Sequence, residues 1–139
     1  MQAAIIAALA STVALLVTTA YFILGSIPLL VLKHDTPLDA RFVRGFFNFY
    51  YKAAIVAAGA TSISYALADR AALAAGGAGL VLLAIVLRRM VIPKMDALGA
   101  QIAYDADAIP GFRRMHLTAI AINIAQLAAI VWSLAAARL

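Results

Sequence analysis

The sequence predicts an all-α integral membrane protein, in which residues 1–139 form a single four-helix bundle with up-down-up-down connectivity. Two observations support this fold class. Hydrophobic residues make up 66% of the chain and charged residues only 12%, which is far from the composition of a soluble globular domain. Residues 3–32 and 115–137 carry no charged side chain, and each run is long enough to cross roughly 30 Å of hydrocarbon.

The first helix is predicted over residues 3–32. It follows Met1 directly without a basic segment and is too long for a secretory signal, so we expect it to be retained as a transmembrane helix. Gly25 and Pro28 predict a bend near its end, because a proline ring removes a hydrogen-bond donor and clashes with the preceding turn.

The second helix is predicted over residues 43–68. Its uncharged part, residues 53–68, is short for a span, so we expect Lys52 to extend its amine to the membrane interface. Aromatic residues at its start predict an interfacial belt, with Tyr65 and Trp132 as anchors at the opposite interface. The residues of the belt are Phe42, Phe46, Phe47, Phe49, Tyr50 and Tyr51.

The third helix is predicted over residues 71–92, with an extension to about residue 104, and the fourth over residues 112–137. Only Asp69 and Arg70 separate the second helix from the third. Such a short connection predicts a tight antiparallel hairpin. Small residues of the third helix are expected to serve packing inside the bundle. These residues are Ala71, Ala75, Gly76, Gly77 and Gly79.

Lysine and arginine residues are distributed unevenly between the two sides of this bundle, and their distribution predicts its orientation. The side with the first and third connections carries Lys33, Arg41, Arg44, Lys52, Arg88, Arg89, Lys94, Arg113 and Arg114, whereas the other side carries only Arg70 and Arg138. Cytoplasmic connections are enriched in these residues. We therefore expect a multi-pass inner-membrane protein with both termini in the periplasm.

The composition disfavours several function classes. The net charge of +5 is spread along helix ends, so we expect the lipid bilayer and its anionic headgroups, not nucleic acid, as a partner. Without cysteine there are no thiolate ligands or thiol nucleophiles. Every acidic residue is an aspartate in or next to a connection, which disfavours a proton or ion pathway. Asp96 is expected to be a solvated neighbour of Lys94. No motif indicates an enzyme, catalytic residues or a metal site, although the enzyme class stays open.

The fourth helix presents two different faces at 100° per residue. One stripe contains His116 and Asn123, and the side-chain amide of Asn123 can form hydrogen bonds across helices. Small residues at a spacing of four form the other face, which allows close helix approach. A small bundle covers one face with its own helices and leaves the other for another protein. The alternative is that the row of alanines arises only because alanine is frequent in this chain. The predicted packing or partner residues are Ala121, Asn123, Ala125, Ala129 and Ser133.

The two histidines, His34 and His116, are predicted on the same side of the membrane. Converging imidazoles could ligate haem iron or copper, so both are candidate cofactor-binding residues. Against this, both histidines are expected at the membrane interface. Neither belongs to a His-x-x-x-His motif or to a carboxylate–histidine pair. The alternative is that they contact headgroups or cap loops.

Two segments of the second half carry a family resemblance. They are Val91-Ile92-Pro93-Lys94-Met95-Asp96, and Phe112-Arg113-Arg114-Met115-His116-Leu117 followed by Asn123 to Gln126. This pattern resembles small four-helix bacterial membrane proteins of the broad copper-resistance-D and anthrone-oxygenase-like type. The resemblance implies that His116 and Asn123 are the functional residues of this chain, because these positions match the family's pattern. The spans contain no further histidine that could serve as a copper ligand.

Three hypotheses for the function follow. The first is a non-catalytic accessory or structural subunit that packs against a larger membrane complex. The second is a haem- or metal-binding membrane redox protein that uses His116, with or without His34. The third is a homo-oligomer with a transport or stress-resistance role.

Overall fold

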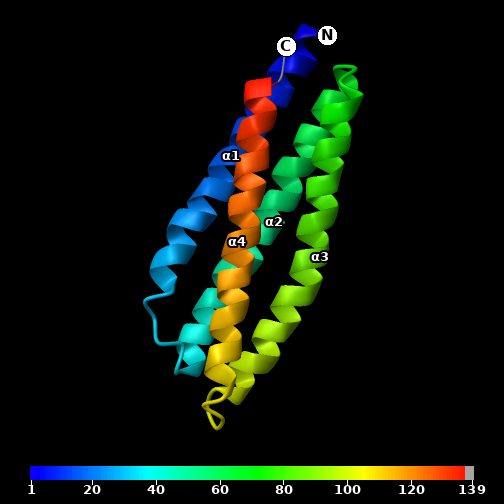
Figure 1. Cartoon of the computed structure of the whole chain (residues 1–139). Helices are drawn as coiled ribbons and strands as arrows, with labels where there is room; N and C mark the ends of the chain where they lie inside the picture. Colours follow the sequence, from blue (N-terminus) through cyan, green and yellow to red (C-terminus); the bar gives the residue numbers. More distant parts are fainter. Residues whose placement is uncertain (137–139) are drawn as a thin grey trace.

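The computed structural model describes residues 1–136, which form four helices and no strand. The helices are α1 (Gln2–Leu29), α2 (Pro37–Leu67), α3 (Ala71–Gln101) and α4 (Ala108–Ala136). They run alternately up and down in one elongated bundle (Figure 1), which confirms the predicted all-α four-helix bundle. The predicted end of the fourth helix at residue 137, and Arg138, lie outside the described residues.

Several helix boundaries differ from the prediction: α4 begins at Ala108 instead of residue 112, α3 ends at Gln101 instead of near residue 104, and local chemistry explains two further differences. α2 begins at Pro37 instead of residue 43, because proline suits the first helical position and the Thr36 side chain accepts a hydrogen bond from the Asp39 backbone N–H at 3.2 Å. α1 ends at Leu29. Pro28 therefore lies in the last turn of α1, where it terminates the helix.

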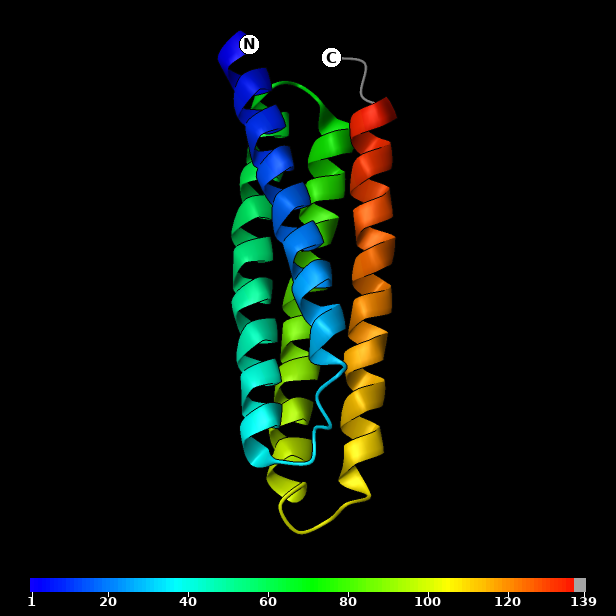
Figure 2. The same ribbon diagram turned by 90° about the vertical axis from the view of Figure 1, so that its left-hand side faces the viewer.

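Three helices, α1, α3 and α4, are long and apolar enough to cross a membrane. This gives the chain the character of a membrane protein in contact with lipid. The predicted second span is not among the three. α2 nevertheless packs against both α1 and α3 (Figure 2). Its membrane crossing stays a prediction.

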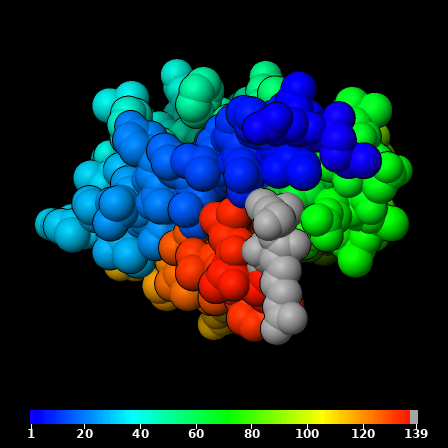
Figure 3. All heavy atoms as spheres, turned by 90° about the horizontal axis from the view of Figure 1, so that it is seen from above, coloured from blue at the N-terminus to red at the C-terminus, as the bar shows by residue number. Residues whose placement is uncertain are grey.

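The bundle has two halves with different interiors. We call the half with the α1–α2 and α3–α4 connections the basic half, and the half with Met1 and the α2–α3 turn the terminal half. The large hydrophobic core lies in the basic half and includes Phe22, Phe47 and Phe112. A much smaller cluster lies in the terminal half and consists of Leu15, Ala58 and Ile130. Seen from the terminal end, α4 lies at the edge of the bundle beside α1 (Figure 3).

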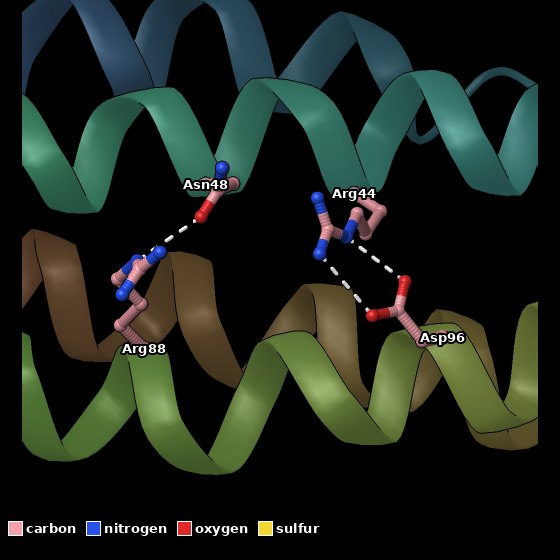
Figure 4. Close-up of polar contacts among 4 residues, drawn as sticks. All are labelled: Arg44, Asn48, Arg88 and Asp96. Carbon is pink, nitrogen blue, oxygen red and sulfur yellow. Dashed lines mark hydrogen bonds and ion pairs between the residues drawn. The ribbon is translucent and has the colours of Figure 1, made fainter.

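The α2–α3 hairpin is closely packed, and polar bonds set its register in the basic half (Figure 4). The Arg44 guanidinium donates to both carboxylate oxygens of Asp96, at 2.9 and 3.2 Å, and Arg88 donates to the Asn48 side-chain oxygen at 3.0 Å. Asp96 is exposed, as expected for a solvated side chain, and it also pairs across the hairpin with Arg44.

A close backbone approach sets the α2–α3 register in the terminal half. A Cβ atom at Gly77 would lie 2.9 Å from the Ser62 backbone nitrogen, so only glycine permits this approach. Ala71, Ala75, Gly76 and Gly79 are exposed, so the expectation that most of these small residues pack inside the bundle is wrong.

The predicted aromatic belt splits into buried and exposed members. Phe47, Tyr50 and Tyr51 are buried, whereas Phe42 and Phe49 are exposed. The belt splits because a helix turns 100° per residue, so residues three or four apart share the face that meets the core. In the terminal half Trp132 is exposed, as an interface anchor requires, but Tyr65 is buried, so its expected anchoring role is wrong.

Candidate functional site

The structure brings His34 and His116 together inside the basic half. His34 lies in the α1–α2 connection and His116 in α4, and both side chains are 0% exposed. The Nε2 atom of His34 lies 3.4 Å from the Nδ1 atom of His116, and the two rings are nearly perpendicular at 87°. Phe112 packs beside His34, and Phe47 packs edge-on against His116. Of the two alternatives to a cofactor role, contact with headgroups is wrong because both side chains are buried, and the capping of loops stays a prediction.

Arg113, three residues before His116, holds the α1–α2 connection against α4. Its guanidinium donates to the carbonyl oxygens of Leu30 at 2.9 Å and Leu32 at 2.7 Å, and it lies 2.9 Å from the Nδ1 atom of His34. The carbonyls that follow the last turn of a helix lack partners within the helix. Arg113 thus satisfies the end of α1, where a cation also complements the helix dipole.

The contacts of Arg113 determine where the ring protons lie. A guanidinium can only donate, so Nδ1 of His34 accepts and the proton of the neutral ring lies on its Nε2. That N–H points to Nδ1 of His116, so His116 carries its own proton on Nε2. The backbone oxygen of Ser26, which can only accept, lies 3.0 Å from that Nε2, and the Ser26 hydroxyl lies equally close. Every ring nitrogen is therefore satisfied when both rings are neutral.

The backbone at His34 is constrained to deliver this side chain. Its φ is +57°, a left-handed conformation that costs a non-glycine residue roughly 1–2 kcal/mol. The hydrogen bonds to Arg113 and His116 offset this cost.

The surroundings of His34 also change its acidity. Burial, and then the neighbouring Arg113 cation, lower the pKa of His34 below its ordinary value of 6.5, while Asp39 and Asp35 oppose the shift.

A second buried polar contact lies deeper in the bundle. The Tyr50 hydroxyl donates to the Asn123 side-chain oxygen at 2.6 Å, and the Asn123 amide donates to the Ala119 carbonyl at 2.8 Å. The neighbouring Tyr51 hydroxyl is buried and has no hydrogen-bond partner among the described residues. Asn123 therefore joins α4 to α2 inside the bundle.

The histidine pair fits a hydrogen-bonded link better than a metal or haem site. Two imidazoles on one tetrahedral metal would also hold their nitrogens roughly 3.3 Å apart. However, no group of three or more His, Cys, Asp or Glu side chains converges within residues 1–136, and the Arg113 cation beside His34 opposes a second cation. Neither histidine lines either of the two 380 Å³ cavities of the bundle. Neither cavity therefore provides space for a haem next to the histidines.

The small residues of α4 lie on its uncovered side. Ala121, Ala125 and Ala129 are exposed, and the half-buried Ser133 donates to the Ile130 carbonyl at 2.7 Å. Ala129 and Ser133 also line a cavity of about 380 Å³ between α3 and α4 in the terminal half, which we call the terminal groove.

The terminal groove is mainly apolar with a few polar atoms. Gly76 of α3 lies opposite Ala129 and Ser133. Thr12 and Tyr65 also line the groove, and their hydroxyls lie 3.4 Å apart. The opening thus combines close access to the helix backbones with buried hydrogen-bonding groups.

Sequence reasoning selected His34, His116 and Asn123 but not their partners. In the sequence, Arg113 is one of several cations near a connection and part of the segment that carries the resemblance, and no pattern marks Ser26. The spacing of Arg113 and His116, one helical turn apart, is the signal that could have linked them. Comparisons with protein-family models, with curated proteins and with solved structures find no match for this chain.

Proposed function

We propose that this protein is a non-catalytic membrane subunit that holds a transmembrane helix of a larger complex against α4 and the terminal groove. One observation carries the proposal, namely the division of α4 into two faces. His116 and Asn123 are engaged by bonds inside the bundle. Ala121, Ala125 and Ala129 remain uncovered along the same helix.

A partner helix suits this surface for physical reasons. Lipid provides no hydrophobic driving force between helices, so association depends on close packing of small residues and on interhelical hydrogen bonds. Gly76, Ala129 and Ser133 supply the small surface, and a Cβ atom at Gly76 would meet nothing within 4 Å. The proposal includes an inner-membrane location with the basic half towards the cytoplasm, supported by the lysine and arginine distribution.

The test replaces Ala125 and Ala129 by leucine together. We expect the tagged, full-length variant, purified from its native membranes in mild detergent, to lose the partner subunits that comigrate with the wild type on native gels. Circular dichroism should be unchanged, because both alanines are exposed. The matched control, Ala60→Leu with Ala78→Leu, places the same bulk on exposed positions of α2 and α3 outside the groove, and it should retain the partners.

Other outcomes of this purification contradict the proposal. If the leucine pair on α4 leaves the association intact, the α4 surface is not the interface. If the protein purifies as a stable oligomer of itself without other subunits, the homo-oligomer hypothesis with a transport or stress-resistance role is favoured. A visible absorption band that disappears in His116→Phe would instead support a haem or metal centre.

A further inference from the structure

A second cavity of about 380 Å³ lies between α3 and α4, in the basic half; we call it the basic groove. Its α3 wall includes Leu87, Val91 and Lys94, and its α4 wall includes Arg114, Thr118 and Ile122. The groove is therefore apolar along its length and has one cation from each helix. It lies at the opposite end of the α3–α4 seam from the terminal groove.

The antiparallel packing places the two cations at one level. α3 and α4 meet at Leu98 and Gly111, where a Cβ atom on Gly111 would lie 3.6 Å from the Leu98 side chain. One helical turn further into the seam comes Lys94 on α3 and Arg114 on α4. Both cations thus lie at the mouth of the groove, next to the connection between the two helices.

Lys94 and Arg114 are both available to a ligand. Both side chains are exposed. The one ion pair among residues 1–136 joins Arg44 to Asp96, so the carboxylate nearest to Lys94 in sequence is already engaged on the α2 side. Two unpaired cations beside an apolar channel complement a ligand with an anionic head and a hydrocarbon tail.

We propose that the basic groove is a binding site for an anionic phospholipid, whose phosphate lies between Lys94 and Arg114 and whose acyl chain follows Val91, Leu87 and Ile122 into the bundle. Lys94 and Leu87 are separated by about 10 Å of helix at 1.5 Å per residue. This covers most of one leaflet of a hydrocarbon core roughly 30 Å thick. The site is separate from the proposed partner surface and does not depend on it.

The experiment measures the binding of defined lipids to the full-length protein in detergent by native mass spectrometry. The probes are dioleoylphosphatidylglycerol, which is anionic, and dioleoylphosphatidylcholine, which is zwitterionic. We expect the wild type to prefer phosphatidylglycerol, and Lys94→Gln with Arg114→Gln to weaken its binding about 30-fold, since each cation near an anionic lipid contributes about five- to sixfold. Binding of phosphatidylcholine should change little.

Two controls separate this site from general electrostatic attraction. Lys33→Gln with Arg89→Gln removes two exposed cations that do not line the groove, and it should weaken phosphatidylglycerol binding less than about threefold. Thr118→Trp fills the groove while both cations remain. We expect it to weaken phosphatidylglycerol binding at least about tenfold, because the acyl chain loses its channel.

The site is refuted by any of three results: equal weakening by the control pair, equal affinity for the two lipids, or full binding by Thr118→Trp. Glycerol 3-phosphate tests a free headgroup as the source of the phosphate. If it displaces the lipid at equal concentration, the groove holds an anion without a chain and the proposal is wrong. If the double glutamine variant is misfolded by circular dichroism, Thr118→Trp decides the result alone.

Discussion

The two halves of the bundle differ in what holds α4 in place. In the basic half, Arg113, His116 and Asn123 bind side chains or carbonyls of α1, α2 and the connection between them. In the terminal half, α4 contributes Ile130 to a small apolar cluster and borders the terminal groove. The same helix is therefore hydrogen-bonded to α1 and α2 in the basic half and held by apolar contacts in the terminal half.

This difference shows how a small bundle in lipid can be rigid and still keep a surface for another molecule. Lipid chains are as apolar as leucine, so apolar side chains alone give little net drive for α4 to pack. Hydrogen bonds provide that drive in the basic half. These bonds join α4 to α1, to α2 and to their connection, but none among residues 1–136 joins it to α3, and the α3–α4 seam holds a groove in each half.

Removing Arg113 is expected to have the largest effect, because it removes the bonds that hold α4 to the end of α1 in the basic half. Arg113→Met leaves the Leu30 and Leu32 carbonyls and His34 without their donor, so we expect the free energy of unfolding in detergent to fall by about 3–5 kcal/mol. Denaturant titration followed by circular dichroism measures this. The control Arg114→Met, at an exposed neighbour, should change stability by less than about 0.5 kcal/mol. An equal loss in both variants would show that only charge matters.

A glycine pair tests how tightly the terminal half is closed around α2 and α3. Gly77→Ala would place a methyl group 2.9–3.0 Å from Ser62 atoms, and we expect a loss of about 1–3 kcal/mol. Gly76→Ala meets nothing within 4 Å and should be neutral or stabilising by up to about 1 kcal/mol. The same unfolding titrations apply. Similar effects at both positions would contradict a closed hairpin beside an open groove.

The pH dependence of stability is the third expected difference, and it concerns the basic half. The folded state lowers the pKa of His34, so it binds fewer protons than the unfolded state as the pH falls. The contribution of His34 to the free energy of unfolding is therefore fully present above about pH 6.5. Below that pH it decreases until the folded pKa is reached, by at most about 1.4 kcal/mol per pH unit. Titrations from pH 8 to pH 5 measure this. His34→Gln should give a shallower dependence, and an unchanged slope would exclude His34 as a cause.

Two neighbouring tyrosines give the smallest expected effect. Tyr50→Phe removes the donor to Asn123 and should cost about 1 kcal/mol, as interhelical hydrogen bonds in membrane proteins do. Tyr51→Phe removes a buried hydroxyl that has no partner among the described residues, so it should be neutral or slightly stabilising. Unfolding titrations of the two variants side by side check this order. The reverse order would show that Tyr51, not Tyr50, forms the important bond.

Much of the fold could be predicted from the sequence, because uncharged runs and short polar connections report directly on helices in lipid. The hairpin at Asp69 and Arg70 is an example. The site could be predicted only in part. His34 and His116 could be selected as rare polar residues, but their contact depends on a left-handed turn at His34 that no residue pattern signals. Arg113 looked like one more interfacial cation, because its role depends on where α1 ends.

Arg113 also has a consequence for the order in which the chain is made. The carbonyls of Leu30 and Leu32 are synthesised early, and their donor arrives only with α4. Unsatisfied backbone groups in or near a membrane cost several kcal/mol. A nascent chain without α4 therefore lacks the donor that satisfies the end of α1 and contacts His34. α4, which is synthesised after α1, thus supplies the hydrogen bonds that the end of α1 lacks.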